Sequence, residues 1–389
     1  MKYMKPTDEI LSQVFTERRS SESTQKSYTR AVRFFEEYTR TKLGDLLIIA
    51  DDEETRNIHW KNSSLKPILI NYRAWLYDKY KEKTANLYFT AITTIFRHYE
   101  IIIGPLPYFS RKNIKKSSPI KPGELPDREL LSEIIGVSTP LLKAVILLAS
   151  SSGLSRIDLL NLKVKDYLKA TEEYHHSNDI FTAISKMNDS EVDIIPTFIL
   201  KRQKTAQEYY TFCSHEAVNA VNNYLMSRTD DFNKNSPLFK VAERYLNNLF
   251  TDMNKELNLG SAGTYGRFTP HMLRRYHATQ LTEAGMSSDK INILEGRKVH
   301  GVIHESYIRM KPEVLKKEYI KALPFIVVED INRVRTELDV TLEKNNKLVN
   351  ENSELKKQNA KTNKRLDNLE KIVLGNVDED DLEKLHKLL

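Results

Sequence analysis

The sequence predicts a mainly α-helical chain with a small β-sheet, two domains and a carboxy-terminal coiled coil. Apolar residues recur at the spacing of a helix face, as in residues 84–100. Two β-rich runs between residues 193 and 213 enclose a polar turn, which is typical of a hairpin. A seven-residue apolar repeat over residues 331–373 indicates a long coiled coil. The expected parts are a helical domain (1–109), a basic linker (110–126), a mixed α/β domain (127–328) and a coiled-coil tail (329–389).

The length and composition are those of a soluble protein with several domains. Of the 389 residues, 40% are hydrophobic, which is enough for a core in each of two or three domains. No apolar run reaches the roughly 18–20 residues of a membrane span, and the start MKYMKPTDEI lacks the apolar stretch of a secretory signal. We therefore expect a cytoplasmic protein. The single cysteine, Cys213, excludes internal disulfides and metal sites built from cysteines.

The excess of positive charge lies before the tail. Lys and Arg number 60 against 53 Asp and Glu, while residues 331–389 contain 12 of each sign. A basic body favours a phosphate-rich partner, because each neutralised phosphate releases counterions. An ordinarily basic soluble protein would have the same balance, so charge alone leaves both interpretations open.

The first domain is predicted to contain amphipathic helices over residues 23–40, 65–83 and 84–100. The first begins with a Ser/Thr capping signal, and the third places its apolar residues on one side. The aromatic side chains of the third, among them Tyr88 and Phe96, favour a core over a nucleic-acid surface. Basic residues between the aromatic ones keep the second interpretation open.

Residues 110–126 are predicted to link the domains. Basic residues alternate there with three prolines, a composition that cannot sustain a helix or a packed strand. The charge either keeps this linker solvated or lets it pass around a DNA duplex. The sequence does not decide between these two roles.

Residues 140–167 predict a buried helix, a Ser/Gly break at 150–153 and a second, amphipathic helix. Arg156 lies near the start of the second helix, beside much apolar sequence. An unpaired buried charge is costly, so this arginine needs an anionic partner. Asp158 and Asp166 are candidates within the chain, and a bound anion is the alternative.

The runs DIIPTFIL (193–200) and EYYTFC (208–213) predict a hairpin with a polar tip. Lys201, Arg202 and Lys204 lie on this tip. Exposed hairpin lysines usually only interact with solvent, so the hairpin alone gives none of them a function.

The stretch TPHMLRRYHATQL (269–281) places four basic side chains in the opening turns of one predicted helix, among them His271 and Arg274. A Gly-Arg-Lys cluster follows in residues 291–324, ahead of Tyr307. So many cationic hydrogen-bond donors at one place predict an anion-binding site.

The order of these motifs resembles the tyrosine recombinase (phage integrase) family. The matching residues are Arg156 in SGLSRIDLLNL, Lys204 in RQKT, His271 and Arg274 in HMLRRYHAT, and Tyr307 in HESYIRM. The resemblance spans roughly residues 20–325. It is strongest to the archaeal branch, whose members tend to have a Gly-Arg element before the tyrosine and a Tyr…Leu-Pro ending. It implies that residues 1–109 form a DNA-contacting core-binding domain and residues 127–328 a catalytic domain.

The resemblance also implies how the reaction would proceed. The six catalytic residues would be Arg156, Lys204, His271, Arg274, Arg297 and Tyr307. The two planar guanidiniums of Arg156 and Arg274 would hold the scissile phosphate, where negative charge builds up. Tyr307 would form a 3′-phosphotyrosyl bond that conserves the energy of the broken linkage, so ligation needs no ATP. A phenol with a pKa near 10 needs a base, for which His271 is the nearest candidate, and Lys204 would protonate the leaving 5′ oxygen. No metal or other cofactor is required.

Two positions depart from the family pattern. The first arginine usually follows the glycine by two residues, but Ser155 occupies that place and Arg156 comes next. The usual Leu-Gly-His before the tyrosine is absent. Following the glycine selects Arg297, which is ten residues before Tyr307. The other candidates for this position are Lys298, which is nine residues before the tyrosine, His300 and His304.

The tail has a heptad register that begins at Ile331. Its first core positions are Ile331, Leu338, Asn345, Asn352, Asn359, Leu366 and Val373, and its second are Val334, Thr341, Leu348, Leu355, Thr362 and Leu369. Successive asparagines weaken a helix pair but favour a parallel dimer in register, because each can bond its own copy. No helix break precedes Gly375, which argues against an intramolecular hairpin. We expect a homodimer through residues 331–373 and, by the resemblance, a tetramer on paired DNA sites; residues 378–389 have no predicted role.

Two other functions compete with recombination. A type IB topoisomerase uses a similar set of residues but relaxes supercoils without exchanging strands. A protein that only binds DNA would have no reason to keep Lys204, His271 and Tyr307 in this order. Tyr276 and Tyr319 lie at helical positions typical of a core, which makes them poor rival nucleophiles. We favour a recombinase that acts on double-stranded DNA and integrates or excises a mobile element, such as an archaeal virus or plasmid; the DNA site itself is not predictable.

Overall fold

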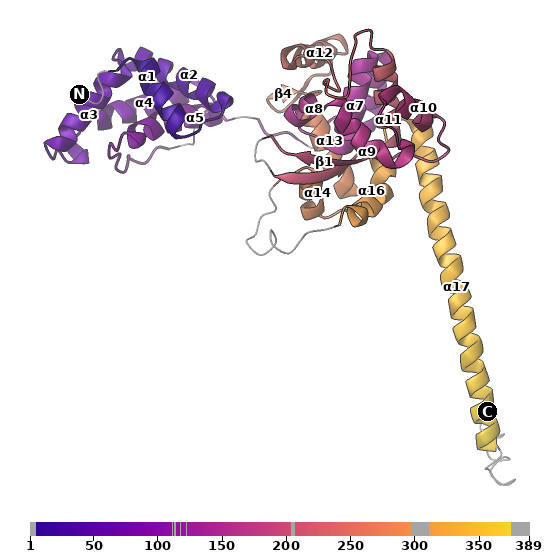
Figure 1. Cartoon of the computed structure of the whole chain (residues 1–389). Helices are drawn as coiled ribbons and strands as arrows, with labels where there is room; N and C mark the ends of the chain where they lie inside the picture. Colours follow the sequence, from indigo (N-terminus) through magenta and orange to yellow (C-terminus); the bar gives the residue numbers. More distant parts are fainter. Residues whose placement is uncertain are drawn as a thin grey trace. The chain divides into compact units, whose positions relative to one another are not determined.

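The computed structural model describes residues 5–110, 112, 114–116, 118–121, 123–203, 207–297 and 311–374. In the last helix, the side chains of residues 330–337, 339, 340, 343 and 367–374 are not described. The described chain is mainly helical with two small antiparallel sheets, so the predicted fold class is confirmed (Figure 1). It divides into two compact units, residues 1–120 and 121–389, and this division falls within the segment predicted as a linker.

The first unit is built from helices around an aromatic core. Its elements are α1 (Thr7–Glu17), α2 (Glu22–Thr39), α3 (Leu43–Thr55), the short 3-10 helix η1 (Trp60–Asn62), α4 (Leu65–Lys79) and α5 (Glu82–His98). Phe35 of α2 lies at the centre. Its ring centroid is 4.8 Å from that of Tyr72 and 6.1 Å from that of Phe96, and both pairs meet edge to face.

The three helices predicted in this unit are present as α2, α4 and α5. Ser21 caps α2 by accepting a hydrogen bond from the backbone N–H of Thr24. Helix α4 ends at Lys79, a few residues before the predicted end, because Tyr80 adopts an extended conformation ahead of α5. Tyr88 and Phe96 are buried, so the interpretation of the aromatic stripe as core is confirmed.

The second unit combines helices with two hairpins. Its helices are α6 (Arg128–Val137), α7 (Pro140–Ser152), α8 (Arg156–Asn161), α9 (Val164–His175), α10 (Ile180–Asn188), α11 (His215–Met226), α12 (Glu243–Glu256), α13 (Pro270–Glu283), α14 (Ser288–Leu294), α16 (Pro312–Ile326) and α17 (Asp330–Leu374). Its strands are β1 (Thr197–Lys201), β2 (Glu208–Phe212), β3 (Ser261–Ala262) and β4 (Tyr265–Gly266). None of the helices in the described ranges has the length and apolar content to cross a membrane.

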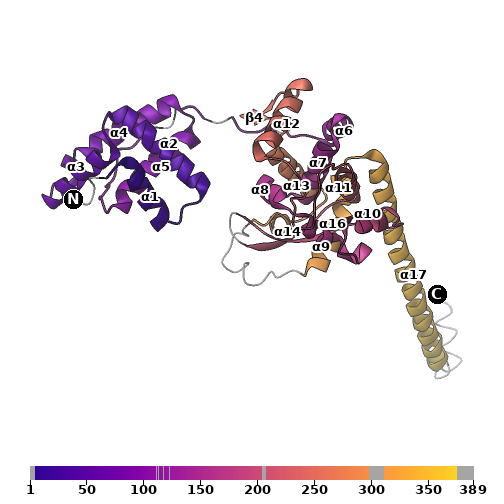
Figure 2. The same ribbon diagram turned by 45° about the horizontal axis from the view of Figure 1, so that its top comes forward.

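Helix α7 is almost wholly buried and lies among the other helices of this unit, with α11 and α13 packed against it (Figure 2). Thr139 caps its start, and it ends at Gly153, whose φ of 64° is left-handed. A Cβ atom at position 153 would lie 2.4 Å from Nδ1 of His277 on α13. Glycine is therefore required both by the backbone and by the close approach of the two helices. Residues 150–152 of the predicted break are still helical, and the helix ends only before Gly153.

The predicted hairpin is present as β1 and β2, with Thr197 opposite Phe212 and Lys201 opposite Glu208. Strand β1 begins later than predicted, directly after Pro196, which has no backbone N–H to donate to a ladder. Helices α9 and α14 contact the hairpin. Residues 204–206 of the tip, which include Lys204, lie outside the described residues.

The tail forms one continuous helix, α17, over Asp330–Leu374. The chain just before it is held by the buried carboxylate of Glu216, which accepts hydrogen bonds from the backbone N–H groups of Val328 at 2.9 Å and Glu329 at 3.0 Å. Lys143 pairs with the side chain of Glu329 at 2.6 Å. The core of the second unit therefore holds the start of the tail. Gly375, the predicted helix break, lies outside the described residues.

Candidate active site

Helix α13 supplies the basic side chains predicted to meet an anion. Thr269 caps the helix by accepting a hydrogen bond from the backbone N–H of Met272, and Pro270 begins it. His271 and Arg274 are three residues apart, so they lie on neighbouring positions of one helix face. His277 continues this face one turn further and is fully buried.

Arg274 is the most enclosed arginine of this group, with 5% of its surface exposed. Its Nη1 donates to the carbonyl oxygen of Gly153 at 2.7 Å, and its Nη2 donates to the carbonyl oxygen of Glu295 at 2.6 Å. Its Nε lies 3.3 Å from Oε2 of Glu295. The two hydrogen bonds use two of the five N–H bonds of the guanidinium, and the contact with Oε2 of Glu295 is an ion pair. The remaining N–H bonds can bind a ligand. Burial lowers the pKa of Arg274, and the charge of Glu295 opposes that effect.

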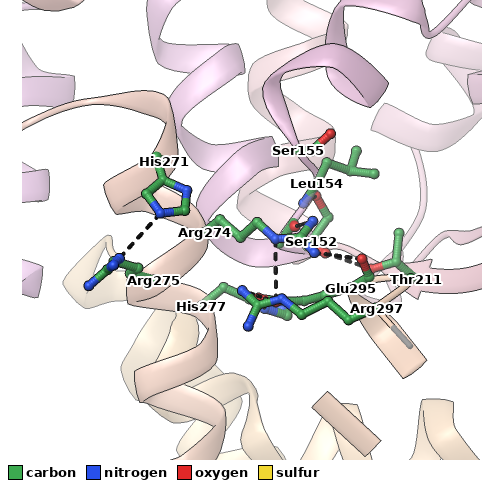
Figure 3. A network of polar contacts seen from close by, with 12 residues as sticks. Ser152, Leu154, Ser155, Thr211, His271, Arg274, Arg275, His277, Glu295 and Arg297 are labelled. Atoms are coloured by element: carbon green, nitrogen blue, oxygen red, sulfur yellow. Dashed lines mark hydrogen bonds and ion pairs between the residues drawn. The ribbon is translucent and has the colours of Figure 1, made fainter. Parts of the chain in front are cut away.

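Arg297 is joined to Arg274 by the carboxylate between them. Helix α14 ends at Leu294, and the chain turns through Glu295 and Gly296, whose φ is 61°. The Nη2 atom of Arg297 lies 2.6 Å from Oε2 of Glu295, the oxygen that also contacts Arg274. The Arg297 side chain is 42% exposed, so its far side can meet a ligand. Figure 3 shows these three residues together with His277.

Arg156 begins α8. The single amphipathic helix predicted after the Ser/Gly break is divided in the structure into α8, which ends at Asn161, and α9, which begins at Val164. Its Nη2 lies 2.6 Å from Oε1 of Glu243, and its Nη1 donates to Oδ1 of Asn247 at 2.8 Å. The expectation that Asp158 or Asp166 would be its partner is wrong. Both acceptors belong to α12, which packs beside α8 although it is distant in the sequence. The side chain is also 37% exposed, so it lies at a rim and not in the interior.

The carboxylate of Asp158 serves the backbone around Arg156 and not the arginine itself. Its Oδ2 accepts a hydrogen bond from the hydroxyl of Ser155 at 2.6 Å, and its Oδ1 accepts one from the backbone N–H of Gln203 at 3.1 Å. Gln203 directly precedes Lys204 on the hairpin tip. Arg202, on the same tip, donates to the carbonyl oxygen of Gly296. The hairpin is thus attached both to α8 and to the turn before Arg297.

One cleft of about 560 Å³ brings three of the predicted cationic residues together. Arg156 lines it from α8, and His271 and Arg274 line it from α13. Polar side chains of α12, including Asn247, form part of the remaining wall. A cleft with two guanidiniums and an imidazole can bind an oxyanion in a fixed orientation.

His271 lies at the mouth of this cleft. Its Nε2 accepts a hydrogen bond from Nε of Arg275 at 3.3 Å. The protein around the imidazole removes enough water to lower its pKa, and the charges of Arg275 and Arg274 lower it further. A neutral imidazole at neutral pH can accept a proton.

The remaining predicted site residues cannot be placed relative to the cleft. Tyr307 and Lys204 lie outside the described residues, and so do the three alternatives to Arg297, which are Lys298, His300 and His304. The nearest described points on either side of them are Arg297 and Lys311 for the tyrosine, and Gln203 and Gln207 for the lysine.

Comparison with known families gives the decisive match. Residues 130–311 match the phage integrase family. This part of the chain belongs to the phage integrase family. The match begins in α6 and includes every residue of the cleft that was predicted from the motifs. The chain is therefore a site-specific DNA recombinase of the tyrosine type, as the resemblance of its motifs predicts.

A search of solved structures finds recombinases and integrases similar to this chain. A variant of the Tn1549 transposon integrase in complex with a circular intermediate DNA has a TM-score of 0.50 at 15% identity, and the match covers 86% of this chain and 99% of that one. XerH recombinase bound to its difH substrate has a TM-score of 0.47 at 16% identity and covers 79% and 82%. XerA recombinase has a TM-score of 0.32 at 20% identity and covers 80% and 97%. A comparison with curated protein sequences finds no match.

Two tyrosines of the integrase unit are excluded as nucleophiles by burial. The hydroxyl of Tyr276 donates to the carbonyl oxygen of Ile326 at 3.2 Å, and that of Tyr319 donates to the carbonyl oxygen of Ser151 at 2.7 Å. Burial raises the pKa of Tyr276 to about 12 and that of Tyr319 well above the usual value. Both are core residues, as their helical positions predict.

Sequence reasoning missed Glu295 and Arg202 of the integrase. Glu295 lies in INILEG, where nothing distinguishes it from a solvent-facing glutamate at the end of a helix. Its one signal is its place directly before the Gly-Arg pair. Arg202 was noted on the hairpin tip, but its acceptor on Gly296 is far away in the sequence. Both contacts depend on how the elements pack.

Proposed function

We propose that this recombinase cuts DNA with Tyr307 as its nucleophile. The proposal rests on the cleft in which Arg156, His271 and Arg274 surround one space, although α8 and α13 are far apart in the sequence. Groups of this kind are suited to a phosphodiester, because planar guanidiniums bind two phosphate oxygens at once. Their positive charges also stabilise the added negative charge of the transition state.

Arg274 would be the main ligand of the phosphate, and Arg156 would bind it as well once DNA is present. The N–H bonds of Arg274 that are not used in the hydrogen bonds to Gly153 and Glu295 meet the non-bridging oxygens, while these two hydrogen bonds keep the side chain in place. Arg156 must exchange its ion pair with Glu243 for the phosphate. This exchange costs little, because an exposed ion pair contributes only about 0–1 kcal/mol.

The chemical step is a transfer of the phosphoryl group from the DNA to the enzyme. The hydroxyl oxygen of Tyr307 attacks the phosphorus, and the bond to the 5′ oxygen breaks. His271 takes the phenolic proton, and Lys204 donates a proton to the departing 5′ oxygen. A 5′ hydroxyl from another strand then reverses these steps. Because the phosphotyrosyl bond conserves the energy of the original linkage, no ATP is consumed.

A nicked suicide DNA substrate tests the nucleophile. The wild-type chain should form a covalent adduct with DNA, visible on a denaturing gel, because the nicked fragment diffuses away and prevents ligation. The adduct should be lost in Tyr307→Phe and retained in Tyr245→Phe, which removes the hydroxyl of an exposed tyrosine on α12. An adduct in Tyr307→Phe would show that the assignment of the nucleophile is wrong.

Strand exchange separates a recombinase from a type IB topoisomerase. Two DNA molecules that each carry a target site should yield recombinant products, and sequencing the junctions should give one crossover position. Relaxation of supercoiled DNA without exchange would favour the topoisomerase. Junctions between a circular and a linear DNA would support our proposal that the enzyme integrates and excises a mobile element.

We also propose that α17 pairs with the α17 of a second copy as a parallel coiled coil. Leu338, Leu348, Leu355 and Leu366 occupy heptad core positions, and each side chain is about half exposed in the single chain. Asn345, Asn352 and Asn359 are exposed on the same stripe. Apolar side chains in a regular stripe are stabilised when a partner helix covers them. Two such dimers on paired DNA sites would form the tetramer.

Sedimentation velocity measures this association. The double variant Leu348→Lys with Leu355→Lys should be a monomer at concentrations where the wild type is a dimer, because it places like charges in the core of the pair. The matched control is Asn350→Lys with Ser353→Lys, which adds the same charge outside the heptad core. Association that survives the leucine changes would contradict the coiled coil.

A further inference from the structure

The turn before Arg297 places one carboxylate among three basic side chains. Glu295 is fully buried. Its Oε2 lies 3.3 Å from Nε of Arg274 and 2.6 Å from Nη2 of Arg297, and its Oε1 lies 3.3 Å from Nδ1 of His277. Figure 3 shows these side chains meeting in the space between α13 and the segment after α14. No other acidic side chain of the described residues contacts Arg274.

Electrostatics explains why a carboxylate is needed at this place. The guanidiniums of Arg274 and Arg297, which both contact Glu295, repel each other. Arg274 is too buried for water to screen that repulsion. A carboxylate between them offsets one of the two charges. The two guanidiniums and the carboxylate together then carry a net charge of +1, which matches the single negative charge of a phosphodiester.

The contacts of Glu295 also fix the orientation of the guanidiniums of Arg274 and Arg297. The carbonyl oxygens of Glu295 and Gly153 accept hydrogen bonds from the guanidinium of Arg274, and the carboxylate of Glu295 forms an ion pair with its Nε. Two hydrogen bonds and an ion pair together hold the planar guanidinium in one orientation. Arg297 is held by the same carboxylate oxygen, so its guanidinium is placed relative to that of Arg274.

The residue after Glu295 connects this cluster to the hairpin. The carbonyl oxygen of Gly296 accepts a hydrogen bond from Arg202, two residues before Lys204. A Cβ atom at position 296 would lie 2.9 Å from the ring of Tyr209 on β2, so the turn and the hairpin are in close contact. The turn therefore joins the helix that carries His271 and Arg274 to the hairpin that carries Lys204.

We infer that Glu295 is a positioning residue for DNA cleavage: it orients the guanidiniums of Arg274 and Arg297 toward the scissile phosphate. The inference rests on the proposed function of these arginines. Glu295 itself should not touch the DNA, because it is fully buried, whereas Arg274 lines the cleft and Arg297 is partly exposed. Its effect should therefore fall on the rate of cleavage and not on the affinity for DNA.

Measuring binding and cleavage separately tests this inference. Glu295→Gln keeps the size of the side chain but replaces one oxygen with an NH₂ group, which cannot accept from a guanidinium. At saturating suicide substrate, its single-turnover cleavage rate should fall about 10²-fold, the effect of a misplacement of about 1 Å. Its DNA affinity, measured by fluorescence anisotropy, should change by less than about threefold, since Glu295 makes no contact with DNA. Glu295→Asp, which keeps the charge, should recover about tenfold of the lost rate.

Two further variants complete the experiment. Glu318→Gln breaks the peripheral ion pair with Lys290 and serves as the matched control, with wild-type cleavage expected. In an Arg297→Ala background, Glu295→Gln should lower the rate by a smaller factor than in the wild type, because residues that act together are not additive. If circular dichroism shows that Glu295→Gln is unfolded, Glu295→Asp alone tests the inference. We expect its cleavage rate to fall roughly tenfold while its DNA affinity is unchanged.

The measurements distinguish a failure of the proposed function from a failure of the inference about Glu295. Absence of a covalent adduct with the wild-type chain would overturn the proposed function and with it the inference. A wild-type chain that cleaves, together with a folded Glu295→Gln variant that cleaves within threefold of it, would overturn the inference alone. Equal losses of affinity and rate would also overturn it, because they indicate a general loss of structure.

Discussion

Two buried carboxylates of the second unit differ in what surrounds them. Glu295 lies beside the cleft and contacts three basic side chains. Glu216 lies beside the start of the tail, where its oxygens accept from the backbone N–H groups of Val328 and Glu329. Burial raises the pKa of Glu216 to about 7, against the effect of these hydrogen bonds.

The difference shows what each region of the molecule requires. Backbone hydrogen bonds are enough to hold a segment of chain in place, even though burial makes the charged form of Glu216 unfavourable. The cleft instead needs several cations at fixed positions, and a carboxylate is the group that allows them to lie close together. The same residue type thus serves as an anchor for a helix in one region and as a spacer between cations in the other.

The largest effect should come from Arg274→Lys, which breaks the cluster around Glu295. A lysine has one ammonium group and cannot reach the acceptors on Gly153 and Glu295 while also binding a phosphate in a planar, two-point manner. We expect cleavage of the suicide substrate to fall about 10²–10³-fold. Arg275→Lys, at the neighbouring half-buried position, is the control and should stay within about tenfold, the scale of one to two hydrogen bonds. Equal losses in the two variants would show that Arg274 has no special role.

Gly153→Ala should remove the close approach of α7 to α13. Alanine is strained at a φ of 64°, and its methyl group would lie 2.4 Å from the buried ring of His277. We expect a loss of roughly 3 kcal/mol in the free energy of unfolding. Gly136→Ala is the matched control, because position 136 has open space and lies in α6, so its stability should be unchanged or rise by up to about 1 kcal/mol. Urea unfolding followed by circular dichroism measures both.

Glu216→Gln tests the anchor of the tail through its pH dependence. A pKa raised from 4.5 to about 7 means that the folded state binds this proton more tightly than the unfolded state. The resulting stabilisation is present below pH 4.5 and is lost as the pH rises toward 7, by up to about 3 kcal/mol at about 1.4 kcal/mol per pH unit. Unfolding free energies should therefore fall more steeply over this range in the wild type than in Glu216→Gln. A constant difference between the two would contradict the assignment.

The smallest effect should come from Glu243→Gln at the rim of the cleft. Glu243 is 55% exposed and its pair with Arg156 is open to solvent, so stability should change by less than about 1 kcal/mol. Because the phosphate no longer competes with a carboxylate for Arg156, the affinity for DNA should rise about twofold to fivefold, the equivalent of up to about 1 kcal/mol. Fluorescence anisotropy at fixed salt measures this change. A weaker affinity would indicate that Glu243 orients Arg156 instead of competing with DNA.

The sequence was most informative where a structure depends on neighbouring residues. The helices around Phe35, the hairpin of residues 197–212 and the single helix of the tail follow from local periodicity, and the interpretation of Tyr276 and Tyr319 as core residues is confirmed. The family, too, follows from motifs that are each only a few residues long. The roles of Tyr307 and Lys204 stay predictions, since both lie outside the described residues.

The sequence was least informative about partners that come from distant elements. For Arg156 it suggested acids within ten residues, whereas the partners come from α12, which lies far along the chain. It contained no sign that Glu295 would be buried among cations.

The sequence alone therefore determined the helices, the hairpin, the heptad repeat and the set of basic residues, because periodicity and local chemistry act over a few residues. Only the tertiary structure decided which of these residues meet. Residues distant in the sequence come within 3.5 Å of one another because α7 packs against α13 and the hairpin packs against the turn at Gly296. Whether a side chain is buried or forms an ion pair depends on all the elements that surround it.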